Sequence, residues 1–168
     1  NMEGARTHFT LGAFELQAPL GRGAMGEVWR GRHVYQDVPV AIKVLKTERI
    51  ERDAERAAEG KEGEHSAAAT FKREADILGK YRHPNIVALL GHCVGAGVER
   101  PCLVCEFMEG ASLKDRLDAS PSAAALTWRE RHTIASDVAR GLAFLHTEAD
   151  PIIIHQAVKP ANILLGAA

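Results

Sequence analysis

Short runs rich in β-branched, aromatic and aliphatic residues alternate with glycine-rich or polar turns over residues 14–46. The runs FELQAPL, GEVWRGRHV and VPVAIKVLK have the length and composition of three antiparallel strands. Two further apolar runs, NIVALLGHCV and PCLVCEFM, follow and are divided by a glycine-containing stretch around residues 95–97. The pattern therefore predicts five strands.

An amphipathic helix is predicted between the third and fourth strands. Phe71, Ala75 and Leu78 recur at i, i+4 and i+7, which places them on one helical face. Glu74 falls on or beside that face, and a carboxylate near apolar side chains needs a partner. The preceding residues 47–65 are dominated by charged side chains, so we expect a flexible, solvated insertion there.

The pattern changes to helix after Gly110. The segment SLKDRL predicts a short helix, and residues 127–146 predict a longer one with apolar residues at helical spacing. Thr127 is expected to cap the long helix, with Glu130 three positions on as its capping-box partner.

Composition excludes several classes of function. The 168-residue chain is 46% hydrophobic and 26% charged with a net charge of −1, as in an ordinary globular domain. No basic patch predicts nucleic-acid binding, and no apolar run predicts a membrane span. The N-terminus lacks a signal-peptide pattern, so we expect a cytoplasmic protein. The three cysteines are odd in number and lack metal-type spacing, so we expect reduced thiols without a redox or metal role.

The stretch GRGAMGEV spaces Gly21, Gly23 and Gly26 as G-x-G-x-x-G. Glycines let a tight turn bring backbone N–H groups against phosphate oxygens with no Cβ in the way. The dinucleotide-binding fingerprint shares this spacing but opens a helix, whereas the residues after Gly26 continue as a strand. A dinucleotide site is therefore disfavoured, and without G-K-[ST] so is a Walker-type loop.

Lys43 ends the run VAIK, in a strand that is otherwise apolar around it. A buried ammonium is costly unless it is paired, so Lys43 should meet an anion. Glu74 and the phosphates of a substrate are the candidates. A solvated lysine at a strand end is the alternative.

Four segments in this order resemble the protein kinase family: GRGAMGEV, VAIK, FKREADIL and HQAVKPANILL, the last at residues 155–165. The lysine in VKPAN is typical of serine/threonine kinases, and PANILL after PIIIH is similar to the receptor-like and tyrosine-kinase-like branch. The resemblance implies an α+β, protein-kinase-like fold. It would have a five-stranded antiparallel small lobe with one helix, plus a partial helical large lobe.

The implied domains are an N-terminal extension at 1–13, a small lobe and hinge at 14–108, and a partial large lobe at 109–168. The chain begins with Asn1 before Met2 and stops shortly after an apolar run. We therefore expect it to be a fragment.

The resemblance also implies ATP and Mg²⁺ as cofactors, and a protein substrate or regulatory partner. Lys43 would hold the α- and β-phosphates while paired to Glu74. Asn162 would bind Mg²⁺, and Lys159 would approach the γ-phosphate and the acceptor hydroxyl.

Further residues are implied to surround the adenine and the ribose. Leu20, Val28 and Ala41 would form the roof of the adenine pocket, and Leu164 would form its floor. Cys105 would be the gatekeeper, and the backbone of Glu106 and Met108 would bind the adenine edge. Ser112 would lie near the ribose. Gly21, Gly23 and Gly26 would lie against the phosphates.

Three departures from the family pattern affect the chemistry. Ala157 stands where the family has the Asp that accepts the substrate proton, and Gln156 stands where it has an Arg. The D-F-G segment lies beyond Ala168. We therefore expect that Mg²⁺ binding is weakened and that the chain is catalytically impaired and pseudokinase-like. We do not expect this chain alone to transfer phosphate. The alternatives are part of an active serine/threonine kinase whose remaining lobe is missing, or a kinase-shaped scaffold that binds no nucleotide.

Overall fold

The computed structural model describes residues 9–11, 13–23, 26–46, 51–52, 55, 58, 66–93, 101–119 and 125–167. It divides into two compact units. The first contains the described residues up to Lys80 together with Ala88–Phe107, and the second contains Tyr81–Val87 and the described residues from Met108 onward. Most of the predicted insertion at 47–65 lies outside the described residues.

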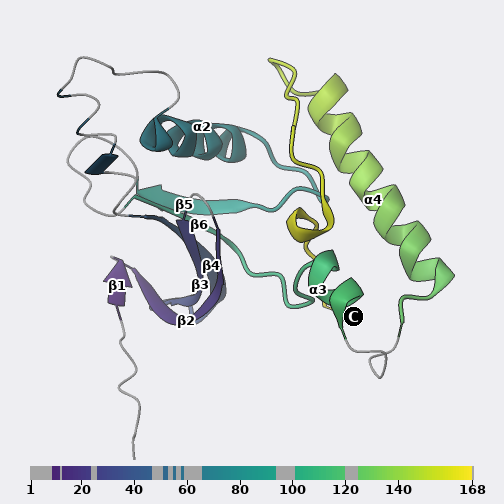
Figure 1. The fold of residues 1–168 in the computed structure, drawn as a ribbon, viewed down its shortest axis with the longest axis horizontal. Helices are drawn as coiled ribbons and strands as arrows, with labels where there is room; N and C mark the ends of the chain where they lie inside the picture. The colour runs from purple at the N-terminus through teal and green to yellow at the C-terminus, as the bar shows by residue number, and fades with distance from the viewer. Residues whose placement is uncertain are drawn as a thin grey trace, which may run out of the picture. The chain divides into compact units, whose positions relative to one another are not determined.

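The first unit is built on an antiparallel sheet with the strand order β1-β2-β3-β4-β6-β5 (Figure 1). The strands are β1 (Phe9–Leu11), β2 (Phe14–Arg22), β3 (Gly26–His33), β4 (Pro39–Leu45), β5 (Leu89–Cys93) and β6 (Cys102–Glu106). The five predicted strands are confirmed, and the predicted number is corrected to six. The added strand β1 lies in the predicted N-terminal extension and pairs with β2, with Phe9 opposite Leu16. A three-residue run is too short to show a period of two, so the sequence pattern did not reveal it.

The two faces of this sheet carry separate hydrophobic clusters, because successive side chains of a strand point to opposite sides. One cluster consists of Leu16, Val40, Ile42, Val44, Cys102 and Val104, with Phe14 and Trp29 packed against it. The other consists of Leu45, Ala67, Phe71, Ala75, Leu89 and Leu103, with Leu78 and Cys105 packed against it.

Helix α2 (Ala67–Lys80) supplies the side chains that cover the second cluster. Phe71 and Ala75 are 0% and 1% exposed, so the predicted apolar stripe is buried. The neighbouring Lys72 and Asp76 are exposed. The helix therefore lies with one face on the sheet, beside β5 and β4 (Figure 1).

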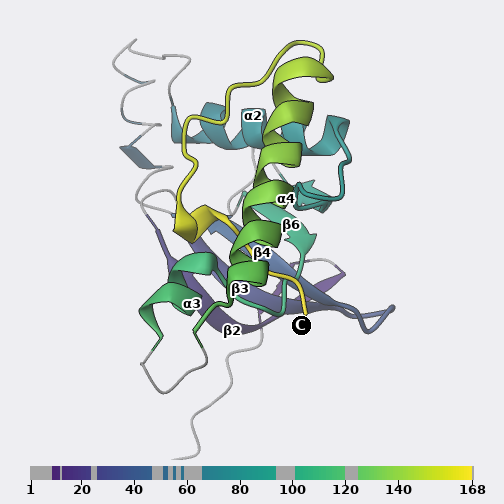
Figure 2. The same cartoon turned by 90° about the vertical axis from the view of Figure 1, so that its right-hand side faces the viewer.

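The second unit contains α3 (Leu113–Asp118), α4 (Trp128–Thr147) and the short 3₁₀ helix η1 (Pro160–Asn162). Figure 2 shows α4 as its longest element, with the chain after α4 returning alongside it. The segment between α2 and β5 packs on α4, since the His83 ring stacks on Phe144 at a centroid distance of 4.9 Å. A Cβ on Gly141 would lie 2.9 Å from the Asn85 carbonyl oxygen.

The predicted capping box of α4 is confirmed. The Glu130 backbone N–H donates to Thr127 Oγ1 at 3.2 Å, and the Thr127 backbone N–H donates to the Glu130 carboxylate at 2.7 Å. Hydrogen bonds from the Thr127 side chain, and then from its backbone, lower the pKa of Glu130. None of the helices in the described part of the chain is long and apolar enough to cross a membrane.

Candidate functional site

The central feature of the first unit is an ion pair between strand β4 and helix α2. Lys43 Nζ donates to both oxygens of Glu74, at 2.8 Å and 2.6 Å. The two side chains are 29% and 38% exposed, and the ammonium lies 5.6 Å from the centroid of the Phe71 ring. The predicted pairing is therefore confirmed. It forms because the buried face of α2 carries Glu74 over the sheet face on which Lys43 lies.

Three of the predicted adenine-pocket residues lie on the same sheet face as Lys43. Val28 is directly opposite Lys43 in the β3–β4 register, and Ala41 is directly opposite Cys105 in the β4–β6 register. Opposite residues of an antiparallel pair project to the same face, and residues two apart on one strand also share it. Val28, Ala41 and Cys105 therefore form a small apolar surface next to the ammonium.

The Cys105 thiol is held neutral by its surroundings. Burial is the main cause, and the Glu74 carboxylate adds to it; together they raise the pKa of Cys105 to about 11, although Lys43 opposes the shift. At pH 7 this side chain is a medium-sized apolar group beside the ion pair, and it carries no thiolate to react or to bind a metal.

The glycines of the loop between β2 and β3 have different roles. The Gly23 backbone N–H donates to the Gly26 carbonyl oxygen at 2.8 Å, which closes the turn. A Cβ on Gly26 would lie 2.2 Å from the Val44 carbonyl oxygen, whereas a Cβ on Gly21 would have no described atom within 4 Å. Gly26 is thus required by the close approach of β3 to β4, a cause that the motif alone did not reveal. Gly21 has no such packing reason.

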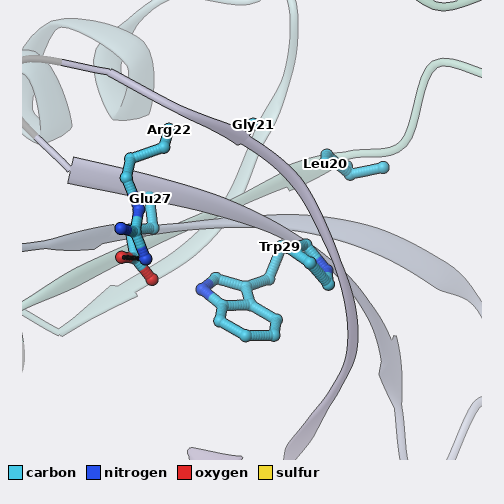
Figure 3. A pocket seen from close by; sticks show the side chains of 6 residues that line it. Leu20, Gly21, Arg22, Glu27 and Trp29 are labelled. Carbon is cyan, nitrogen blue, oxygen red and sulfur yellow. Dashed lines mark ion pairs between the residues drawn. The ribbon is translucent and has the colours of Figure 1, made fainter.

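A shallow pocket lies at the end of the β2–β3 hairpin (Figure 3). It is lined by Pro19, Leu20, Gly21, Arg22, Glu27 and Trp29. The Arg22 guanidinium and the Glu27 carboxylate form an ion pair, with an N–O distance of 2.6 Å. Glu27 and Trp29 flank Val28 in β3, so they project to the opposite face from Val28 and Lys43. This pocket is therefore separate from the apolar surface of Val28, Ala41 and Cys105 that lies next to the Lys43 ammonium.

Glu106, the last residue of β6, forms two hydrogen bonds with the backbone of Ala88. Its N–H donates to the Ala88 carbonyl oxygen at 3.0 Å, and its carboxylate accepts from the Ala88 N–H at 2.7 Å. The carbonyl oxygen is the Glu106 backbone group that remains for the predicted contact with adenine.

The second unit contains Met108 and the remaining predicted site residues. Ser112 is buried and caps α3, where its Oγ accepts from the Asp115 N–H at 3.1 Å. That hydroxyl also donates to the Asp115 carboxylate, so its hydrogen bonds already serve the helix cap. Ser112 forms an isolated antiparallel bridge with Leu164.

The loop HQAVKPANILL is held together by local hydrogen bonds. Asn162 Nδ2 donates to the Ala157 carbonyl oxygen at 2.8 Å, and His155 Nδ1 accepts from the Ala157 N–H at 3.3 Å. Gln156 has a φ of 59°, in the left-handed region that non-glycine residues rarely adopt. This strained position directly precedes Ala157, and the sequence pattern gave no sign of it. Lys159 is exposed and lies just before η1.

The donors in this loop fit Mg²⁺ only in part. The amide oxygen of Asn162 is a suitable hard ligand, and its orientation is fixed by the hydrogen bond from its own nitrogen. The loop contains no Asp or Glu, however, so it offers no charged ligand of its own. Among the described residues, no group of three or more His, Cys, Asp or Glu side chains could hold a metal ion.

Comparison with known families agrees with these features. The sequence profile described as protein tyrosine and serine/threonine kinase matches residues 14–168. The chain belongs to the protein kinase family. Its relatives include receptor-like and serine/threonine kinases, in line with the resemblance carried by the four motifs.

Three relatives illustrate the range of similarity. The chain is 43% identical over 159 residues to the leucine-rich repeat receptor protein kinase MSL1 of Oryza sativa subsp. japonica, covering 92% of this chain and 10% of that protein. It is 46% identical over 152 residues to U-box domain-containing protein 52 of Arabidopsis thaliana, covering 90% and 16%. It is 38% identical over 149 residues to the serine/threonine-protein kinase pelle of Drosophila melanogaster, covering 87% and 27%. The kinase chain thus spans between 10% and 27% of the length of these relatives.

The two glycines provide a test of the packing analysis. Gly26→Ala should lower the free energy of unfolding by about 1–3 kcal/mol, because the added methyl group collides with the backbone of β4. Gly21→Ala is the matched control and should change it by less than about 0.5 kcal/mol. Urea unfolding monitored by circular dichroism measures both. Equal losses in the two variants would contradict the analysis.

Proposed function

We propose that this kinase chain binds ATP through its first unit and is impaired in phosphoryl transfer. The observation that carries the proposal is the Lys43–Glu74 pair, with Nζ–O distances of 2.8 Å and 2.6 Å. An ammonium held at a fixed point beside an apolar surface is the arrangement that a nucleotide needs, with phosphate at the charge and adenine on the apolar side chains.

The proposed phosphate contacts involve Lys43 and the backbone of the glycine loop. Both carboxylate oxygens of Glu74 accept hydrogen bonds from the Lys43 ammonium. Glu74 is therefore a positioning residue for Lys43 and has no contact with the nucleotide. The Lys43 ammonium has three N–H groups, and two point at Glu74. The third is available to an α- or β-phosphate oxygen.

The proposed adenine contacts involve the apolar side chains of Val28, Ala41 and Cys105 and the carbonyl oxygen of Glu106. Leu20, Met108, Ser112 and Leu164 stay predictions for this site. Bound Mg²⁺ would neutralise phosphate charge, and Asn162 is the residue that would hold it. Because the loop offers no carboxylate beside that amide, we expect the affinity for Mg²⁺ to be weak.

The proposed impairment follows from Ala157. A methyl group cannot accept the proton of a substrate hydroxyl, and a positioned general base contributes about 10²–10⁴-fold to such a rate. The neighbours of Ala157 do not replace it, since His155 Nδ1 already accepts from the Ala157 N–H and the Asn162 nitrogen donates to the Ala157 carbonyl oxygen. Lys159 is a cation and cannot serve as the base while protonated.

Two alternatives lead to different expectations. In an active serine/threonine kinase that contains this chain, another group would accept the proton, and phosphotransfer would be measurable. In a kinase-shaped scaffold, the chain would bind partner proteins without nucleotide. We favour the ATP-binding proposal over the scaffold because the ion pair is retained. A cytoplasmic location, and a protein substrate or regulatory partner, belong to the same proposal.

ATP binding is tested by titration calorimetry, with and without Mg²⁺. The chain should bind ATP, and Lys43→Met should weaken binding by about 10- to 100-fold, because one charge-assisted hydrogen bond is lost. Lys72 is an exposed lysine on α2, and Lys72→Met is the matched control, which should leave the affinity for ATP unchanged. No binding by the chain would support the scaffold, and equal losses in the two variants would contradict the role that we assign to Lys43.

Impairment is tested by transfer of labelled γ-phosphate to a generic protein substrate, with Lys43→Met as the background. The rate should fall at least 10²-fold below the ordinary kinase range of about 1–100 s⁻¹. Because ATP binding is measured on the same sample, a low rate cannot be mistaken for a lack of nucleotide. A rate within the ordinary range that Lys43→Met abolishes would identify an active kinase.

A further inference from the structure

Two of the three cysteines meet across strands β5 and β6. Cys93, the last residue of β5, is directly opposite Cys102, the first residue of β6. Opposite residues in antiparallel strands have Cα atoms about 4.5 Å or about 5.5 Å apart, depending on whether the pair is hydrogen-bonded. Both values lie within the range of about 4.4–6.8 Å that a disulfide spans. The spacing of the cysteines along the sequence did not indicate this pairing.

The two thiols are free and differ in exposure. Cys93 is exposed at the edge strand of the sheet, whereas Cys102 is 3% exposed and belongs to the cluster formed by Leu16, Val40, Ile42, Val44 and Val104. Burial raises the pKa of the Cys102 thiol, the adjacent Cys93 thiol raises it further, and a hydrogen bond from the Cys93 backbone opposes the shift.

Cys105 is excluded from this pair by its position. It lies three residues after Cys102 on β6, so it projects to the opposite face of the sheet, where it packs against the cluster that contains Phe71 and Leu103. It is therefore a control thiol of the same strand.

We propose that Cys93 and Cys102 form a redox-sensitive pair that peroxide converts into a disulfide bond across the β5–β6 hairpin. In the first step, the Cys93 thiolate attacks hydrogen peroxide, which gives Cys93 sulfenic acid and, with one proton, a molecule of water. In the second step, the Cys102 sulfur attacks the Cys93 sulfur. The S–O bond breaks, the S–S bond forms, and the hydroxyl leaves as a second molecule of water with the Cys102 proton.

The exposure of the two residues suits this order of events. Peroxide needs to reach only the exposed Cys93, and the buried Cys102 then acts as the resolving thiol from the adjoining strand. Exposed disulfides in a reducing environment are usually transient and regulatory, and a dithiol returns them to two thiols. The bond would join the edge strand β5 to β6 and stabilise the hairpin.

The pair is tested on the 168-residue chain by treatment with hydrogen peroxide, alkylation of remaining thiols, digestion after glutamate and mass spectrometry. Cleavage after Glu99 and Glu106 separates Cys93 from the peptide that contains Cys102 and Cys105. We expect an intramolecular link between these two peptides, a loss of two hydrogen atoms from the intact chain, and a higher melting temperature that dithiothreitol reverses.

Three variants identify the partners. Cys105→Ala should keep the link, whereas Cys93→Ala and Cys102→Ala should both abolish it. If Cys102→Ala fails to fold, alkylation of the oxidised wild-type chain still decides the question, since one thiol, that of Cys105, should remain. Oxidation of Cys93 to a sulfinic acid with two thiols left, or a link that Cys105→Ala removes, would overturn the proposal. None of these readouts depends on ATP.

Discussion

The ion pair between Lys43 and Glu74 is the interaction on which the candidate site depends. Removing an ammonium from water is costly, and a carboxylate that accepts two of its hydrogen bonds compensates for that cost only when both groups are held in place. Strand β4 fixes the lysine, since its neighbours Ile42 and Val44 are buried. Helix α2 fixes the glutamate through Phe71 and Ala75. The site is thus a consequence of how one helix packs on one sheet.

Much of this arrangement could be predicted from the sequence, because it rests on local periodicity. The apolar stripe that includes Phe71 has a period that only a helix satisfies, and the same period places Glu74 toward the sheet. The capping box of Thr127 and Glu130 could also be predicted, because its two residues lie three positions apart in the sequence. The remaining features depend on which residues face each other between strands: the contact of Gly26 with β4, the pairing of Cys93 with Cys102, and strand β1. Strand register is set by how two strands pair and by the geometry of the turn between them, and the side-chain periodicity of a single strand does not reveal it.

The proposed function assigns to different units two properties that kinase motifs usually combine. Nucleotide binding is proposed for the first unit, where the charged and apolar groups are already in position. Proton transfer would be a property of the loop in the second unit, where Ala157 has no side chain to accept a proton. Hydrogen bonds from the Ala157 N–H to His155 Nδ1 and from Asn162 Nδ2 to the Ala157 carbonyl oxygen hold this loop together. The conformation of this loop therefore does not require a carboxylate at position 157.

The most direct test of the account is a double-mutant cycle on ATP affinity, with Lys43→Met, Glu74→Gln and the double variant measured by titration calorimetry. If Glu74 acts by positioning the ammonium, Glu74→Gln should weaken ATP binding in the wild-type chain and should have little further effect when Lys43 is already Met. The coupling energy between the two positions should exceed about 0.5 kcal/mol. Losses that simply add would contradict the account, because Glu74 would then influence the nucleotide independently of Lys43.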